Sequence, residues 1–178
     1  MPDTLRIATS HDAATIAALV NDAYRPGPTS GGWTHEAMLV DGDRTDTGQI
    51  AALIARTDGA LLVGCRRDAI VACVDLRQHD EHIAIGLLAV APALQNTGVG
   101  KAMLAHAETY AVQHFKPHRL VMQVIGERAE LMAFYTRRGY APNGRVTAYP
   151  NNSGIGQAKT ELRIIELHKL AEPAALAG

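Results

Sequence analysis

The fold is decided by the stretch Val90-Ala91-Pro92-Ala93-Leu94-Gln95-Asn96-Thr97-Gly98-Val99-Gly100-Lys101-Ala102. An almost wholly apolar run, residues 83–90, precedes it, and an amphipathic segment that ends at Phe115 follows its two closely spaced glycines. This order predicts a strand, a tight loop and a helix. Such a loop leaves several backbone N–H groups unpaired at the positive end of a helix dipole, and glycine lets an anion touch them. We therefore expect a ligand that carries a pyrophosphate.

Spacing separates three kinds of glycine loop that bind phosphates. The nucleotide triphosphate loop needs a glycine five positions before its Gly-Lys pair and a hydroxyl directly after it, but these positions hold Gln95 and Ala102. The dinucleotide fingerprint needs a third glycine where this chain has Met103. The pattern that remains is Gln-x-x-Gly-x-Gly, formed by Gln95, Gly98 and Gly100.

This pattern resembles the acyl-coenzyme-A pyrophosphate loop of the GNAT superfamily of N-acetyltransferases. A second GNAT signature is a helix that ends in an aromatic-Tyr pair and is followed by polar residues, a glycine and an aromatic. The chain matches it with Ala133-Phe134-Tyr135-Thr136-Arg137-Arg138-Gly139-Tyr140. The resemblance extends over about residues 5–168, with specific motifs only in 87–102 and 130–140. It implies an acetyl-coenzyme A-dependent N-acetyltransferase.

Composition limits the other possibilities. The 178 residues fit one domain, and 17 basic against 18 acidic residues, without a basic block, disfavour nucleic-acid binding. Cys65 and Cys73 lie in apolar runs without metal-ligand spacing, so we expect buried free thiols. No export signal and no apolar run of bilayer length is present, so we expect a cytoplasmic protein that does not contact membranes. The sequence leaves open whether it forms a homodimer.

Periodicity and turn residues predict a β-α-α-β-β-β-α-β-α-β-β order. The expected strands are 5–8, 60–65, 69–76, 83–90, 119–125, 140–148 and 161–168. The four expected helices of this order are 13–24, 49–56, 99–115 and 127–138, and residues 34–40 are expected to add a short helix. The resemblance implies a single α/β domain over 1–178. In it, a mixed, mostly antiparallel sheet of six to seven strands is flanked by about four helices, and the strand before the glycine loop splays from the next. Residues 169–178 are expected to be a frayed tail.

The resemblance also assigns the residues that would bind acetyl-coenzyme A, as a co-substrate and without a metal. They are Leu88, Ala89 and Val90 on the strand, Gln95, Asn96, Thr97, Gly98, Val99, Gly100 and Lys101 in the loop, and Arg128. Many family members have asparagine at the position of Arg128. An arginine there either pairs with a phosphate or carboxylate, or is an ordinary solvated residue at a helix start.

The chemistry needs a proton donor for the departing thiolate and a base for the amine. Tyr135 aligns with the tyrosine that GNAT enzymes place beside the thioester sulfur, although a core aromatic would fit its position too. The glutamate that many members use as the base aligns with Ala84. His82 and Glu81 are the nearby candidates, and their alternative is a solvated strand entrance.

The acceptor pocket of the family is built from the first helices and the loop between the last strands. Candidate lining residues are Tyr24, Trp33, Glu36 and Tyr149, each of which could instead anchor a loop. The leading hypothesis is transfer of an acetyl group to a small amine or an amino acid. A noncatalytic acyl-coenzyme A sensor and a protein N-terminal or lysine acetyltransferase stay open as alternatives.

Overall fold

Seven strands form the main sheet of the structure, a computed structural model that describes residues 1–27 and 32–171. In spatial order they are β1 (Thr4–Ile7), β3 (Gly59–Arg66), β4 (Ala69–Gln78), β5 (His82–Val90), β6 (Arg119–Ile125), β9 (Arg163–Leu170) and β7 (Ala141–Ala148). Every neighbouring pair is antiparallel except β5 and β6, which are parallel. The predicted mixed, mostly antiparallel sheet is therefore confirmed.

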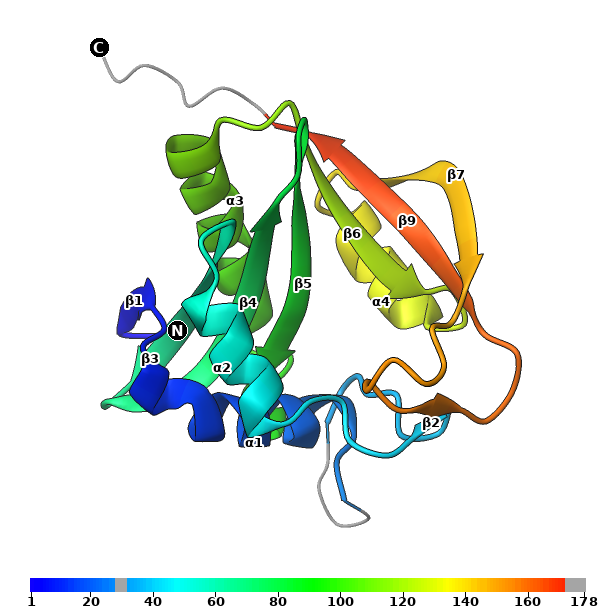
Figure 1. Ribbon diagram of the computed structural model, residues 1–178, viewed down its shortest axis with the longest axis horizontal. Helices are drawn as coiled ribbons and strands as arrows, with labels where there is room; N and C mark the ends of the chain where they lie inside the picture. The colour runs from blue at the N-terminus through cyan, green and yellow to red at the C-terminus, as the bar shows by residue number, and fades with distance from the viewer. Residues whose placement is uncertain (28–31, 172–178) are drawn as a thin grey trace.

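Helices cover both faces of this sheet (Figure 1). Within the described residues the α-helices are α1 (Ala13–Tyr24), α2 (Thr47–Ala55), α3 (Val99–Phe115) and α4 (Ala129–Thr136), with 3-10 turns at Ser10–Asp12 and Pro92–Leu94. The apolar sides of α1 and α2 form one core with β3, and those of α3 and α4 form a second core on the other face. None of the helices in this part of the chain has the length and apolarity needed to cross a membrane.

Turn chemistry fixes the ends of several elements. Arg67 and Asp68 both have positive φ, 48° and 65°, as the tight hairpin between β3 and β4 requires. Gly98 begins α3 with φ of 92°, and Gly139 follows α4 with φ of 87°. A left-handed residue after a helix is the usual glycine cap, so the predicted end of α4 at Gly139 is correct to within two residues.

The strands β5 and β6 meet at one end and diverge at the other. Their pairing extends only from His82 opposite Arg119 to Ala84 opposite Val121. Beyond this point they separate, and Figure 1 shows the opening between them widening toward the end of the molecule that carries α1. The predicted splay of the central strands is confirmed.

A β-bulge lies in β5 just where the splay begins to open. Asp75 on β4 faces Gly86, whereas Cys73 faces Ala89, so β5 contains one extra residue between these pairs. Leu87 takes up the extra residue with a φ of 49°. As a result, the odd-numbered side chains of β5 point to one face of the sheet before the bulge and to the opposite face after it. Ile83 and Ile85 belong to the core under α3, while Leu87 and Ala89 belong to the core under α1.

Two expectations from the sequence need correction. Residues 34–40, expected as a helix, form turns that end in a short strand β2 (Val40–Asp41), which pairs with β8 (Gln157–Ala158). Tertiary contacts override local preference here, because the amide of Glu36 donates to Tyr24 O at 2.7 Å. The expected frayed tail begins too early, since β9 continues to Leu170. Residues 172–178 lie outside the described residues.

Candidate active site

The glycine loop opens a space at the start of α3. Asn96 and Gly98 both have positive φ, 62° and 92°, which turns the chain sharply into the helix. A Cβ added at Gly98 would meet nothing within 4 Å, and one at Gly100 would meet only Val90 Cγ2 at 3.6 Å and Phe134 Cζ at 3.9 Å. The first N–H groups of a helix have no partner within it. The loop thus presents free amides to open space, as a pyrophosphate would require.

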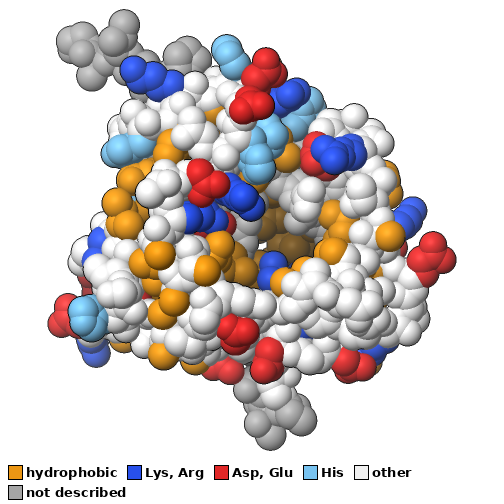
Figure 2. Space-filling view, in the orientation of Figure 1, with side chains coloured by type: hydrophobic (Ala, Val, Ile, Leu, Met, Phe, Trp, Pro, Cys, Tyr) orange, Lys and Arg blue, Asp and Glu red, His pale blue; other side chains and the backbone are white. Residues whose placement is uncertain are grey.

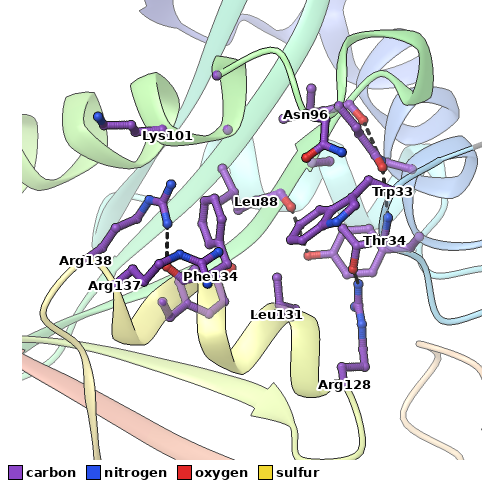
Figure 3. A pocket seen from close by; sticks show the side chains of 18 residues that line it. Trp33, Thr34, Leu88, Asn96, Lys101, Arg128, Leu131, Phe134, Arg137 and Arg138 are labelled. Carbon is purple, nitrogen blue, oxygen red and sulfur yellow. Dashed lines mark hydrogen bonds between the residues drawn. The ribbon is translucent and has the colours of Figure 1, made fainter.

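A cavity of about 290 Å³ lies beside this loop, and we call it the loop cavity (Figure 3). Most residues expected from the sequence to bind acetyl-coenzyme A line it, namely Leu88, Ala89, Val90, Gln95, Asn96, Gly98, Gly100, Lys101 and Arg128. Thr97 and Val99 do not. The hydroxyl of Thr97 donates to Leu94 O at 2.6 Å, and Val99 is buried in the core, so these two residues have only backbone groups to offer a ligand.

The side chain of Gln95 is used to hold two segments together. Its Oε1 accepts a hydrogen bond from the amide of Thr34 at 3.1 Å, and its Nε2 donates to Val90 O at 3.3 Å. Gln95 thereby connects the segment around Thr34 to the end of β5 through two hydrogen bonds. Its part in the site is to shape the loop cavity.

Four cationic side chains, Lys101, Arg128, Arg137 and Arg138, line the loop cavity. Arg138 lies over the ring of Phe134, with Cζ 3.5 Å from the ring centroid, and donates to Phe134 O (Figure 3). Its buried Nε has no partner among the described residues. Together with the loop amides, these charges favour an anion with several negative charges.

Tyr135 lies at the inner end of the loop cavity. It is only 7% exposed, and within residues 1–27 and 32–171 its hydroxyl makes no hydrogen bond. Burial raises its pKa above the ordinary value of 10, so the phenol keeps its proton at neutral pH. A buried, protonated and unpartnered hydroxyl at a cavity wall can donate a proton to a ligand atom.

A second cavity of about 560 Å³, which we call the splay cavity, is lined by the diverging strands β5 and β6. Figure 2 shows a hollow near the middle of this face, with Lys and Arg side chains around it. The two cavities share one set of wall residues: Tyr24, Leu88, Arg128, Leu131 and Tyr135. Ligands in the two cavities would therefore meet at Tyr135 and at the bulge in β5.

The four residues expected to line an acceptor pocket fall in different places. Tyr24 lines both cavities, and its hydroxyl donates to Leu88 O at 3.4 Å. Glu36 and Tyr149 line the splay cavity. Trp33 instead lines the loop cavity, where its ring centroid is 6.2 Å from that of Phe134. The structure thus puts Trp33 on the side of the glycine loop and away from the splay cavity.

A buried ionic cluster closes one end of the splay cavity. Arg25 Nη2 donates to Glu36 Oε1 at 2.9 Å and lies 3.3 Å from the hydroxyl of Tyr149. Arg128 Nη1 lies 3.8 Å from Glu36 Oε2, and its Nη2 donates to the hydroxyl of Thr34 at 2.5 Å. The Arg128 side chain is 7% exposed, so the alternative of a solvated arginine is wrong.

The two candidate bases differ in position. His82 is half-buried, lines the splay cavity, and stacks on His79 with 4.7 Å between ring centroids. Burial and the charges of His79 and Arg119 lower its pKa below 6.5, so the imidazole is neutral at neutral pH and can accept a proton. Glu81 lines neither cavity. Its side chain is 71% exposed and lies 3.8 Å from Arg119.

Sequence reasoning missed several residues of the site. Arg137 and Arg138 belong to the second motif, and a basic pair next to a recognised motif was a usable signal. Arg44, which lines the splay cavity, and Arg25, which pairs with Glu36, lie in loops, where no periodic pattern marks them. The bulge at Leu87 has no signal in a run of apolar residues. Among the described residues, no three His, Cys, Asp or Glu side chains are grouped to hold a metal ion.

Several solved structures share the fold of this chain. The ribosomal-protein-S18-alanine N-acetyltransferase of Escherichia coli has the same fold, with a TM-score of 0.70, 14% identity, and coverage of 98% of this chain and 97% of that one. A spermidine N-acetyltransferase chimera from Vibrio cholerae and hSSAT has a TM-score of 0.68 at 16% identity, with 94% and 95% covered.

A GNAT acetyltransferase from Elizabethkingia anophelis, solved with acetyl-CoA bound, has a TM-score of 0.54 at 23% identity, with 64% and 76% covered. No curated protein matches the sequence significantly. The sequence model of the acetyltransferase (GNAT) family matches residues 17–140, which include both motifs and all of β5. This chain therefore belongs to the GNAT family of acetyltransferases.

Proposed function

We propose that this protein transfers an acetyl group from acetyl-coenzyme A to the primary amine of a small molecule or amino acid, by direct attack of the amine on the thioester. The observation that carries the proposal is the meeting of two cavities at Tyr135 and Leu88. One cavity has free helix amides and four cationic side chains, which suit the phosphates of coenzyme A. The other leads to the same point from between β5 and β6.

Acetyl-coenzyme A would supply an activated acetyl group, held to sulfur by a bond that an amine can displace. The loop amides and Lys101 would hold its pyrophosphate, and Arg137 and Arg138 would add positive charge at the same cavity. The free space above Gly98 and Gly100 supports this assignment, because the chain leaves it unfilled by its own side chains.

The protein's own groups would then move two protons. His82 lies six residues before Leu88 on β5, so this imidazole, neutral because its pKa is lowered, would take the proton of the attacking amine through water molecules in the splay cavity. As the new carbon–nitrogen bond forms and the carbon–sulfur bond breaks, the hydroxyl of Tyr135 would give its proton to the departing sulfur. The raised pKa of Tyr135 supports this role, since the donor must be protonated when substrate binds.

The fold does not determine which amine accepts the acetyl group. The structural neighbours are named for a ribosomal-protein alanine in one case and for spermidine in another, and each shares less than a fifth of its residues with this chain. A screen of amines for thiol release from acetyl-coenzyme A tests the proposal directly. Turnover with a small amine supports it. Coenzyme A binding without turnover for any small amine or peptide would overturn it in favour of a sensor.

A further inference from the structure

The splay cavity carries a surplus of positive charge that its own carboxylates do not balance. Three acids line it, and each is already paired: Glu36 with Arg25 at 2.9 Å, Asp75 with Arg56 at 2.7 Å, and Glu166 with Arg145 at 3.6 Å. None of them is a free counter-ion for a cationic substrate.

Arg44 is a cation of the splay cavity without an acidic partner. It lines the cavity, is half-buried, and has no carboxylate oxygen within 4.0 Å in the part of the chain that the structure describes. Its guanidinium lies 5.4 Å from the ring centroid of Tyr24, whose hydroxyl donates to Leu88 O, next to the bulge at Leu87. The uncompensated charge of Arg44 therefore lies over the ring of Tyr24, a residue that lines both cavities.

Arg128 adds to the same surplus. It shares the carboxylate of Glu36 with Arg25, and Glu36 is 3.8 Å from Arg128 but 2.9 Å from Arg25. The other acid near Arg128 among the described residues is Glu130, at 3.6 Å, whose side chain is 41% exposed. Its Nε is buried and has no hydrogen-bond partner among residues 1–27 and 32–171. A buried polar group without a partner is costly unless a ligand or water satisfies it. Arg128 lines both cavities at their junction.

We infer that the splay cavity recognises the carboxylate of its substrate through Arg44, with Arg128 at the junction, and that the acceptor is a free amino acid. This inference rests on the proposed function. A guanidinium pairs with a carboxylate through two parallel hydrogen bonds, and the pair is strongest where water is excluded. In an α-amino acid the amine and the carboxylate share one carbon atom, so binding of the carboxylate beside Tyr24 keeps the amine close to Tyr135. A polyamine would instead bring further positive charge to Arg44, which has no acidic partner among the described residues.

The test compares each free amino acid of a panel with its own carboxamide, which keeps the amine and the side chain but lacks the charge. The panel also contains spermidine and a peptide with an N-terminal alanine. Two readouts are used on the full chain: thiol release from acetyl-coenzyme A, and calorimetric binding in the presence of coenzyme A. For at least one amino acid we expect the carboxylate form to be preferred more than about tenfold in both readouts.

Arg44→Gln removes the charge while keeping hydrogen-bonding capacity, and it should reduce this preference to less than about threefold. The matched control is Arg77→Gln, on the wall of the same cavity, because the Arg77 guanidinium is occupied by Asp58 at 3.2 Å. It should leave the preference unchanged. Affinity of acetyl-coenzyme A should be the same in all three proteins.

The two proposals fail in different ways. Amides, spermidine or the peptide binding as well as every free amino acid would overturn the inference, even if they are acetylated. An unchanged carboxylate preference in Arg44→Gln would also overturn it. Selective binding of an amino acid without any thiol release would leave the inference standing and reject the proposed function.

Discussion

The carboxylate of Glu36 accepts a hydrogen bond from Arg25 at 2.9 Å, and the two side chains are only 5% and 7% exposed. Glu36 also lies near Arg128, so one buried acid holds the loop after α1 against the start of α4. Removing one member of a buried ion pair leaves the other charge without compensation, which costs far more than losing a surface pair. The cluster therefore stabilises the fold around the splay cavity, and two of its members, Glu36 and Arg128, also line that cavity.

Glu36→Gln should lower the free energy of unfolding by about 3 kcal/mol, because the buried Arg25 then loses its carboxylate partner and the buried Arg128 keeps only the half-exposed Glu130. Urea unfolding of both proteins at pH 7 measures this change. The control is Glu130→Gln, which removes an acid 41% exposed and 3.6 Å from the same Arg128. A surface pair of this kind contributes at most about 1 kcal/mol. Equal losses in both variants would show that burial does not decide the effect.

Gly100→Glu should weaken coenzyme A binding by more than about tenfold, since the side chain would enter the space beside the loop amides and repel phosphate. The fold should tolerate the substitution, because a Cβ at this position meets only ordinary contacts at 3.6 Å and beyond. Titration calorimetry gives the affinity, and thermal melting checks the fold. Ala105→Glu puts the same charge on an exposed position of α3 and should bind normally. A folded Gly100→Glu protein with wild-type affinity would reject the loop as the phosphate site.

Tyr135→Phe should reduce kcat by about 100-fold or more, with little change in stability or coenzyme A affinity. The ring and its packing remain, and only a hydroxyl without a protein partner is lost. Because burial raises the pKa of Tyr135, wild-type activity should not fall through ionisation of this phenol below about pH 10. Single-turnover rates separate chemistry from product release. Tyr110→Phe, on the outer part of α3, should retain full activity, and an equally active Tyr135→Phe enzyme would make Tyr135 a packing residue only.

His82→Gln should remove the acid limb of the pH profile of kcat/KM. In the wild-type protein His82 must be neutral to accept a proton, so activity should fall as the pH drops through its pKa, which lies below 6.5. Besides His79 and Arg119, the charges of Glu166 and Arg145 act on this imidazole. The same lowered pKa makes folding less favourable below pH 6.5, since the unfolded chain binds the proton first.

Profiles are best measured with a saturating amine whose own titration is known, and His114→Gln on α3 is the control. Retention of the wild-type acid limb in His82→Gln would assign the base to another group or to water. Loss of activity at every pH with an unchanged limb shape would also contradict a role for His82 as the titrating base.

Much of the fold follows from local pattern, because the elements that build it are regular and their ends carry turn residues. The hairpin at Arg67 and Asp68, the helix start at Gly98 and the apolar strand β5 can all be read from sequence. The conformation of residues 34–40 could not be predicted from sequence, since hydrogen bonds to distant segments hold these residues in turns. The amide of Thr34 donates to Gln95, and that of Glu36 to Tyr24.

The residues of the site show the same contrast between what local motifs predict and what tertiary packing decides. Its loop cavity is formed by contiguous motifs, so residues such as Gly98 and Arg128 could be named from spacing and resemblance. Its splay cavity combines loop residues far apart in the chain, including Glu36, Arg44 and Tyr149, which come together only through tertiary packing. Trp33 shows the limit most plainly, because its segment was expected beside the acceptor and its ring packs near Phe134 instead.

The bulge at Leu87 also has a consequence for how the molecule unfolds. Because β5 changes face there, it supplies apolar side chains to the core under α3 and to the core under α1. Neither core can open without withdrawing side chains from a strand that the other core holds. We expect a single cooperative denaturation transition rather than stepwise melting of two halves. The amides of β5 should then be among the slowest in the chain to exchange with deuterated solvent, so that the junction of the two cavities is built on its most persistent segment.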